Sequence, residues 1–342
     1  MSSSRIPVHA VIAAFAATLL MGLITPAHAD SESYAPVDRP GPPLSVSEHD
    51  LDAALTCHGD LDGPHDVALF VAGTTMTPQE NFSWNWFRAM DQLERPYCGV
   101  TVPAKGMGDI AVSAEYVVHA IRTIHERTGR QVDVLGHSQG GMSPRFALRF
   151  WPDLRAMVDD YVGFAPSNRG GVVVDAMCLP VVGCSPALHQ QTFDSAFTQA
   201  VNSHQETFEG ISYTVIYTRL DEFIQPNLDD TGSSSLRTGD GEITNVALQD
   251  VCPVNVTEHL LVGTADPVAH ALAMDALDHP GPADPARVPP AVCTRAFMPG
   301  VDPATFATDF AGTTAKVAEQ LLLARRVARH PDLPAYVFAE RG

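Results

Sequence analysis

The stretch Val132-Asp133-Val134-Leu135-Gly136-His137-Ser138-Gln139-Gly140 decides the fold, because its apolar first half leads directly into the pattern G-x-S-x-G. This pattern is typical of a nucleophile elbow, a sharp and strained turn from a strand to a helix that lifts a serine hydroxyl into solvent. Glycines flank the serine because side chains there would collide with the adjoining backbone. A chain with 25 glycines can match so short a pattern by chance, so the rest of the sequence has to support it.

Around this turn, short β-branched apolar runs alternate with longer helical patterns, which favours a parallel sheet. We predict strands at 67–71, 98–102, 132–135, 161–164 and 211–217. We predict helices at 110–127, 139–150, 268–277 and 303–328, and one that is capped by Ser47 and runs toward Cys57. No linker divides residues 47–342, so we expect a single α/β catalytic domain with a mostly parallel central sheet and helices on both faces.

Residues 1–29 have the pattern of a secretory signal peptide. Arg5 precedes an apolar stretch at 11–24, and the small-residue site Ala27-His28-Ala29 follows it. The apolar stretch is shorter than the about 20 residues that a membrane span needs. We therefore expect cleavage after this site, a secreted, extracellular protein, and a flexible proline-rich segment at 30–46.

The mature chain would carry a net charge of about −20, since residues 1–29 hold one of the 21 basic residues and none of the 40 acidic ones. Such a surface repels nucleic acid and strongly anionic membranes, and it favours solubility outside the cell. It also helps to expel a carboxylate product. We expect a monomer that binds no nucleic acid and does not insert stably into membranes.

All six cysteines follow the cleavage site, and an even number in a chain bound for an oxidising compartment predicts disulfides. Six cysteines allow 15 connectivities, of which the simplest pairs neighbours in order. That pairing joins Cys57 with Cys98, Cys178 with Cys184, and Cys252 with Cys293. The sequence has no C-x-x-C pair and no H-E-x-x-H helix, so we expect no zinc or other metal site.

A serine hydroxyl is a weak nucleophile, so Ser138 needs a histidine to accept its proton and a carboxylate to orient that histidine. On a sheet of this kind the chain order is serine, acid, histidine. Asp221 follows the strand predicted at 211–217 and is a suitable acid. His259 follows the run 251–256, which we interpret as a further strand, and is a suitable base.

Residue spacing alone leaves alternative candidates for both the acid and the base. Glu222 adjoins Asp221 and Asp229 is near, so spacing does not single out the acid. Asp133 lies in the strand before the serine and is interpreted as a residue of the fold. The rival histidines, which we interpret as packed or surface residues, are His189, His204, His270 and His279.

Attack on a carbonyl also requires hydrogen-bond donors for the oxyanion. The usual donors are the amide after the nucleophile and a second donor on the loop after an early strand. Gln139 supplies the first amide. Gly73-Thr74 follows the strand predicted at 67–71, and Thr74 offers an amide and a hydroxyl. A plain turn is the competing interpretation of this loop.

Several segments together resemble the Candida antarctica lipase B-like family of secreted α/β-hydrolase lipases, over most of the mature chain. They are 51–57, 73–74, 138–141, 164–166, 190–192, 221–226, and 251–253 running on to His259. So many matches in the same order are far more specific than the elbow alone.

The resemblance implies the α/β-hydrolase fold, with Ser138, Asp221 and His259 as the triad and Thr74 and Gln139 at the oxyanion hole. It also implies two of the disulfides, Cys57 with Cys98 and Cys252 with Cys293. The family works without cofactor or metal and cleaves ester or lipid substrates through an acyl-serine intermediate.

Three departures from the family limit what carries over. His137 stands where the family's lipase B has a tryptophan at the floor of its alcohol pocket, so we predict a wider substrate pocket. Cys178 and Cys184 enclose the region where the family has a short mobile helix, so a disulfide there should restrain the lid and weaken interfacial activation. The chain after Cys293 is divergent and lacks the family's last disulfide.

The sequence thus predicts a secreted serine hydrolase that cleaves carboxylic esters, a lipase or esterase. One alternative is an acyltransferase that uses the same triad with an alcohol or sugar acceptor. An alternative of another class is a non-catalytic binding protein with a hydrolase fold, although such proteins usually lack a member of the triad.

Overall fold

The computed structural model describes residues 33–178 and 183–340, and the chain from Ser33 onward forms one compact unit. The predicted signal peptide at 1–29 lies outside the described residues.

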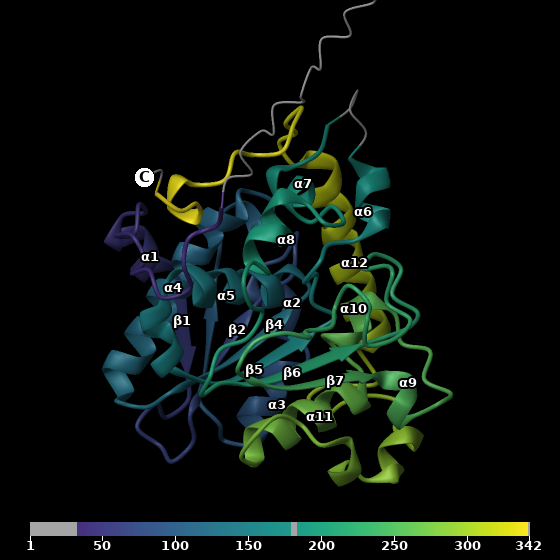
Figure 1. The fold of residues 1–342 in the computed structure, drawn as a ribbon. Coiled ribbons are helices and arrows are strands. Elements are labelled where there is room, and N and C mark those ends of the chain that lie inside the picture. Colours follow the sequence, from purple (N-terminus) through teal and green to yellow (C-terminus); the bar gives the residue numbers. More distant parts are fainter. Residues whose placement is uncertain (1–32, 179–182, 341–342) are drawn as a thin grey trace, which may run out of the picture. The chain divides into compact units, whose positions relative to one another are not determined.

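Among the described residues, a seven-stranded sheet forms the centre of the unit, in the order β1-β3-β2-β4-β5-β6-β7 (Figure 1). The strands are β1 (Leu55–His58), β2 (Val67–Val71), β3 (Tyr97–Val100), β4 (Val132–His137), β5 (Val158–Phe164), β6 (Ser212–Tyr217) and β7 (Glu242–Ala247). β1 runs antiparallel to β3, and the other neighbours are parallel. The predicted mostly parallel sheet is confirmed.

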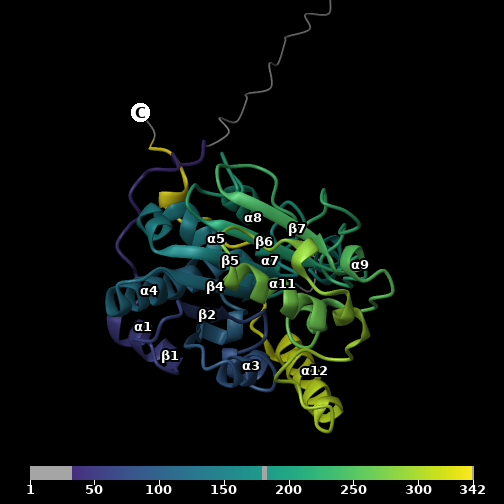
Figure 2. The same ribbon diagram turned by 90° about the horizontal axis from the view of Figure 1, so that it is seen from below.

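Helices cover both faces of this sheet, and the structure has the α/β-hydrolase fold (Figures 1 and 2). α4 (Ile110–Thr128) and α5 (Gln139–Phe150) pack on one face, whereas α3 (Trp86–Gln92) and α11 (Pro267–Asp278) pack on the other. Along β2, Leu69 enters the first core and Phe70 the second, because successive side chains point to opposite faces.

The remaining helices are short, apart from α12. They are α1 (Glu48–Ala54), α2 (Pro78–Phe82), α6 (Val172–Met177), α7 (Pro186–Gln190), α8 (Ala196–Val201), α9 (Leu248–Val251), α10 (His259–Val262) and α12 (Phe306–Leu323). Short 3₁₀ turns lie at Pro103–Gly106, Pro152–Ala156, Pro285–Arg287, Pro290–Thr294 and Ala335–Val337.

α4 illustrates how the sequence pattern becomes packing. Val117, Ile121 and Ile124 recur at helical spacing and are at most 1% exposed in the first core. Burial of each such side chain contributes about 1.5–3 kcal/mol. The helix begins at the cap Asp109, whose side chain accepts from the amide of Ala111, and it ends at Gly129 in the left-handed conformation.

The strand predicted at 251–256 is wrong. These residues form the end of α9 and a turn, in which Val254 and Val256 are 80% and 81% exposed. Pro253 has no N–H to donate to a ladder, which disfavours a strand there. The last strand is instead β7. Its burial is uneven and it contains polar residues, so it does not form an apolar run in the sequence.

The segment predicted to be flexible at 30–46 differs from the structure over residues 33–46, which are bound to the compact unit. The amide of Ala35 donates to Val337 O at 2.9 Å, and Trp151 Nε1 donates to Pro42 O at 2.9 Å. Ser45 Oγ donates to Glu115 Oε1 at 2.7 Å. The prolines make this segment extended, and these long-range hydrogen bonds fix its position.

α12 is shorter than the helix predicted at 303–328, and most of its surface is exposed. Figure 2 shows it at the margin of the unit, away from the centre of the sheet. One helical stretch of the described chain, His259–Asp278, is long and apolar enough to cross a membrane, but 72% of its 18-residue apolar window is buried inside the fold.

Candidate active site

Ser138 lies on a sharp turn between the end of β4 and the start of α5. Its backbone has φ 55° and ψ −121°, a region that costs a residue other than glycine about 1–3 kcal/mol. A Cβ added at Gly136 would lie 2.0 Å from Gly140 O, and one added at Gly140 would lie 2.0 Å from Val71 O. Both flanking positions therefore require glycine, as the elbow pattern predicts.

Ser138, His259 and Asp221 form one line of hydrogen bonds. Ser138 Oγ lies 3.0 Å from His259 Nε2, and His259 Nδ1 lies 2.7 Å from Asp221 Oδ2. The other carboxylate oxygen of Asp221 accepts from the amides of Phe223 at 2.9 Å and Ile224 at 2.6 Å. These two amides fix the carboxylate, and the carboxylate in turn fixes the imidazole ring.

The rival acids do not occupy this position. Glu222 Oε2 accepts from the backbone amide of His259 at 3.0 Å, so it supports the base without touching its ring. Asp229 is exposed and binds Thr231. Asp133 lies near the start of β4, five residues before the serine.

The rival histidines also make contacts elsewhere. His270 stacks on Trp86 with ring centroids 4.9 Å apart, and His279 Nδ1 lies 2.9 Å from Asp275 O. His189 Nε2 lies 3.1 Å from Val327 O, and His204 Nε2 lies 3.3 Å from Tyr34 O.

The charges around His259 favour its protonated form. Burial by itself lowers the pKa of His259, but the carboxylates of Asp221, Glu222 and Glu258 outweigh burial and raise the pKa above its ordinary value. A positive charge that forms on this ring during proton transfer is thereby stabilised.

Thr74 and Gln139, the predicted oxyanion residues, are joined by a hydrogen bond. Gln139 Nε2 donates to Thr74 Oγ1 at 3.2 Å and to Gly106 O at 2.8 Å. Gln191 Nε2 also donates to Thr74 Oγ1, at 3.0 Å. The backbone of Gln139 begins α5, where the helix N-terminus favours a negative charge. Residue spacing missed Gln191, whose only signal in the sequence is its segment at 190–192.

His137, predicted to shape the substrate pocket, lines the cavity but is only 1% exposed. Its Nδ1 lies 3.2 Å from Asn81 Oδ1 and its Nε2 lies 3.1 Å from His259 O. Burial, followed by the neighbouring ring of His259, lowers the pKa of His137 to about 3, so the ring is neutral and donates to one acceptor only. The side chain therefore packs behind the base, and this contact with the His259 backbone has no signal in the sequence.

A cavity of about 310 Å³ opens beside Ser138 and His259, and apolar side chains make up most of its wall. α6 contributes Val174 and Met177, and α12 contributes Phe310 and Leu321. The apolar stripe on α12 thus faces the cavity along part of its length. Beyond the cavity, Leu322 and Leu323 at the end of α12 are 79% and 70% exposed.

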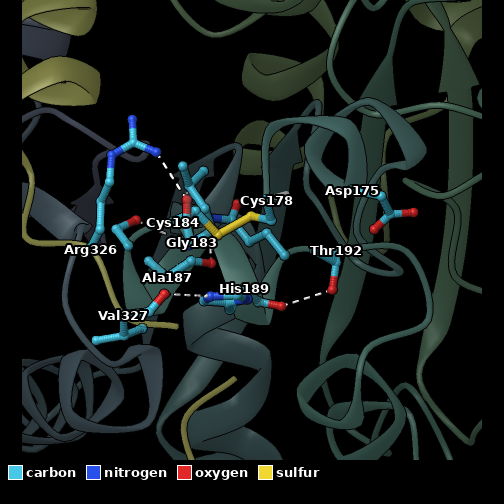
Figure 3. Close-up of a disulfide and its surroundings, with 12 residues drawn as sticks. Asp175, Cys178, Gly183, Cys184, Ala187, His189, Thr192, Arg326 and Val327 are labelled. Carbon is cyan, nitrogen blue, oxygen red and sulfur yellow. Dashed lines mark hydrogen bonds between the residues drawn. A yellow bond between two sulfur atoms is a disulfide. The ribbon is translucent and has the colours of Figure 1, made fainter. Parts of the chain in front are cut away.

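All three predicted disulfides are present, and no described cysteine is free. The Cys178–Cys184 disulfide follows α6, and residues 179–182 between the two cysteines lie outside the described residues (Figure 3). Val327, which follows α12, exchanges two backbone hydrogen bonds with Cys184, at 2.8 and 3.3 Å. Arg326 Nη1 donates to Gly183 O at 2.9 Å (Figure 3). Gly183 and the disulfide-bonded Cys184 therefore hold the chain that follows α12.

Known proteins are similar to this chain in sequence and in structure. The family model described as "Lipase (class 2)" matches residues 113–252, which include Ser138 and Asp221. Lipase B of Pseudozyma antarctica is 33% identical over 223 residues, which are 64% of this chain and 64% of that protein. The chain thus spans slightly less than two thirds of the length of this curated relative.

The crystal structure of Aspergillus fumigatus lipase B superimposes with a TM-score of 0.80 at 26% sequence identity, covering 89% of this chain and 74% of that one. The two sequence matches and this structural match together show that the chain is similar to class 2 lipases and to lipase B proteins, in agreement with its α/β-hydrolase fold.

Proposed function

We propose that this protein is a secreted carboxylic ester hydrolase, a lipase or esterase that acts through an acyl-serine intermediate. The observation that carries the proposal is the line from Ser138 Oγ to His259 Nε2 at 3.0 Å and from His259 Nδ1 to Asp221 Oδ2 at 2.7 Å. Its position at an apolar cavity supports an acyl substrate.

In this mechanism Ser138 Oγ attacks the ester carbonyl while His259 Nε2 accepts the hydroxyl proton. The proton then passes to the departing alcohol, and an activated water molecule releases the acid from the serine in the same way. Asp221 holds the imidazole and stabilises its positive form. Proton transfer of this kind contributes about 10²–10⁴ in rate.

The developing oxyanion would be bound by the amide of Gln139 and by Thr74. Thr74 Oγ1 accepts hydrogen bonds from Gln139 and Gln191, which orient this hydroxyl. Its own hydrogen donates to Gln191 Oε1 at 3.4 Å and would turn from that long contact toward the substrate. Each such donor contributes about 10²–10³ in rate.

Ester or lipid substrates fit the wall of the cavity better than polar ones. A volume of about 310 Å³ takes an acyl chain, and the exposed leucines at the end of α12 extend the apolar surface beyond the cavity. The proposed enzyme is a monomer and needs no cofactor, metal or stable membrane insertion for this chemistry.

Replacement of the nucleophile tests the proposal. Ser138→Ala should abolish hydrolysis of an ester series and labelling by a fluorophosphonate probe, because no nucleophilic oxygen remains. Ser143→Ala, in the same helix and likewise buried, should keep both. Circular dichroism and thermal unfolding should show that both variants fold.

Turnover retained in Ser138→Ala would overturn the triad. A rate that peaks at short acyl chains identifies an esterase, whereas a peak at long chains identifies a lipase. Transfer to an added alcohol that exceeds hydrolysis in water would instead identify the acyltransferase alternative.

A further inference from the structure

A second cavity, of about 350 Å³, lies at the amino ends of the parallel strands and takes no part in the proposed ester chemistry. Asp133 in β4 and Asp159 and Asp160 in β5 contribute to its wall. Asp133 precedes Ser138 by five residues along an extended strand, so the two sites are about 16 Å apart.

Three carboxylates converge in this cavity. One oxygen from each of Asp66, Asp133 and Asp159 lies within 4.8 Å of the others. An irregularity in the pairing of β4 with β5 brings them together, because Val132 pairs with Val158 and Val134 with Tyr161. Asp159 and Asp160 therefore both lie opposite Asp133, and such bulges redirect side chains.

Asp160 provides a second, independent sign of a missing partner. Its side chain lines the same cavity and is only 6% exposed, and its Oδ1 has no hydrogen-bond partner among the described residues. An unpaired carboxylate oxygen is costly to bury, so native structures satisfy it with a hydrogen bond, a proton or a cation.

Two arginines near the cavity each form an ion pair. Arg130 Nε lies 3.3 Å from Asp66, and Arg95 hydrogen-bonds to Asp278. In the described part of the chain, no ion pair reaches Asp133, Asp159 or Asp160.

Burial and mutual repulsion act on these carboxylates together. Burial, followed by Asp66 and Asp159, raises the pKa of Asp133, and burial, followed by Asp133, raises the pKa of Asp160 to about 9. A bound cation would offset both the burial and the mutual repulsion of these carboxylates.

We propose that Asp66, Asp133 and Asp159 bind a calcium ion in this cavity, with Asp160 beside them as a further oxygen donor. Ca²⁺ takes six to eight oxygen ligands at 2.3–2.6 Å, so two of its ligands lie at most about 5 Å apart, as these carboxylate oxygens do. Mg²⁺ prefers one or two carboxylates and several waters, which fits four clustered aspartates less well. The remaining volume of the cavity accommodates water ligands.

Calcium-dependent stability tests the proposal. The full chain is stripped with EDTA, dialysed, and unfolded thermally at constant ionic strength with increasing CaCl₂. The melting temperature should rise and saturate, by about 4 °C or more when calcium is in hundredfold excess over Kd. Calorimetric titration should show one calcium site.

Asp159→Asn and Asp133→Asn should weaken calcium binding at least tenfold. In EDTA both variants should melt above the parent, because repulsion within the cluster falls.

Asp62→Asn is the matched control, since it removes one exposed negative charge from the loop before β2 and should keep the full calcium response. A melting temperature that does not depend on calcium would overturn the site. So would a calcium response that persists in both cluster variants, or an equal response to MgCl₂, which would indicate screening of the acidic surface.

Discussion

At the scale of single residues, His259 should set the acid side of the pH profile. The imidazole must be neutral to accept the proton of Ser138, and the carboxylates around it raise its pKa. Activity should therefore appear only as pH rises through a value above the ordinary histidine pKa of about 6.5. A pH profile of kcat/KM for a soluble ester measures this limb directly.

Glu222→Gln should move the acid limb to lower pH, because one of the negative charges that raise the His259 pKa is removed. The amide oxygen of Gln can still accept the His259 N–H that Glu222 now accepts. Asp229→Asn is the charge-matched control on an exposed carboxylate and should leave the limb in place. An unchanged limb in Glu222→Gln would contradict this account.

The sequence pointed to candidate site residues that follow strands, such as Ser138 after β4 and Asp221 after β6. It left open the choices that depend on local backbone geometry. Chain order and a clear apolar strand pointed to the turn that holds Asp221. Spacing could not separate Asp221 from Glu222, because what separates them is the pair of amides that hold the Asp221 carboxylate. The contact of His137 with the His259 backbone spans 122 residues, and no local pattern encodes it.

At the scale of secondary structure, the sequence predicts the central strands of the sheet better than the strands at its edges. The strand predicted at 67–71 has the bounds of β2, which is buried along its whole length and reads as an uninterrupted apolar run. β1 and β7 are edge strands with exposed positions, and neither stood out. The apolar run 251–256 was misread because hydrophobicity alone does not distinguish a buried strand from an exposed turn.

The Cys178–Cys184 disulfide should restrain the mouth of the cavity. Cys178 follows α6, Cys184 is hydrogen-bonded to Val327 after α12 (Figure 3), and both helices line the cavity. We expect the rate on a short-chain ester to pass smoothly through the solubility limit of the substrate. In Cys178→Ser/Cys184→Ser we expect a rate increase above that limit, because the lid can then open at an interface.

Rates measured across the solubility limit, for parent and double variant, test this restraint. His189→Ala is a useful control, since it removes a contact with Val327 and keeps the disulfide. A sharp rise in the rate of the parent protein above the solubility limit of the substrate would show that the disulfide does not restrain the lid.

At the scale of the whole molecule, two groups of polar residues lie at opposite ends of the strands of the central sheet. The carboxyl ends of the strands carry the serine, histidine and aspartate line at an apolar cavity, and the amino ends carry the carboxylate cluster. A chain with 40 acidic and 21 basic residues carries a net negative charge, which attracts cations and repels anions. A neutral ester can approach such a surface, and its carboxylate product is repelled from it.

Secretion is the prediction that concerns the molecule as a whole. Export of the full-length chain into an oxidising compartment should yield a protein that begins at Asp30 and has no titratable thiol, since all six cysteines pair. A chain without residues 1–29, made in a reducing cytosol, should keep six thiols and melt lower. Two of the bridges span 41 residues each, which corresponds to about 4 kcal/mol per bridge in the chain-entropy model.

N-terminal sequencing, thiol titration and thermal unfolding give the three readouts. Oxidation of the cytosolic protein in vitro should restore the melting temperature, whereas six free thiols in the exported protein would contradict the proposed compartment.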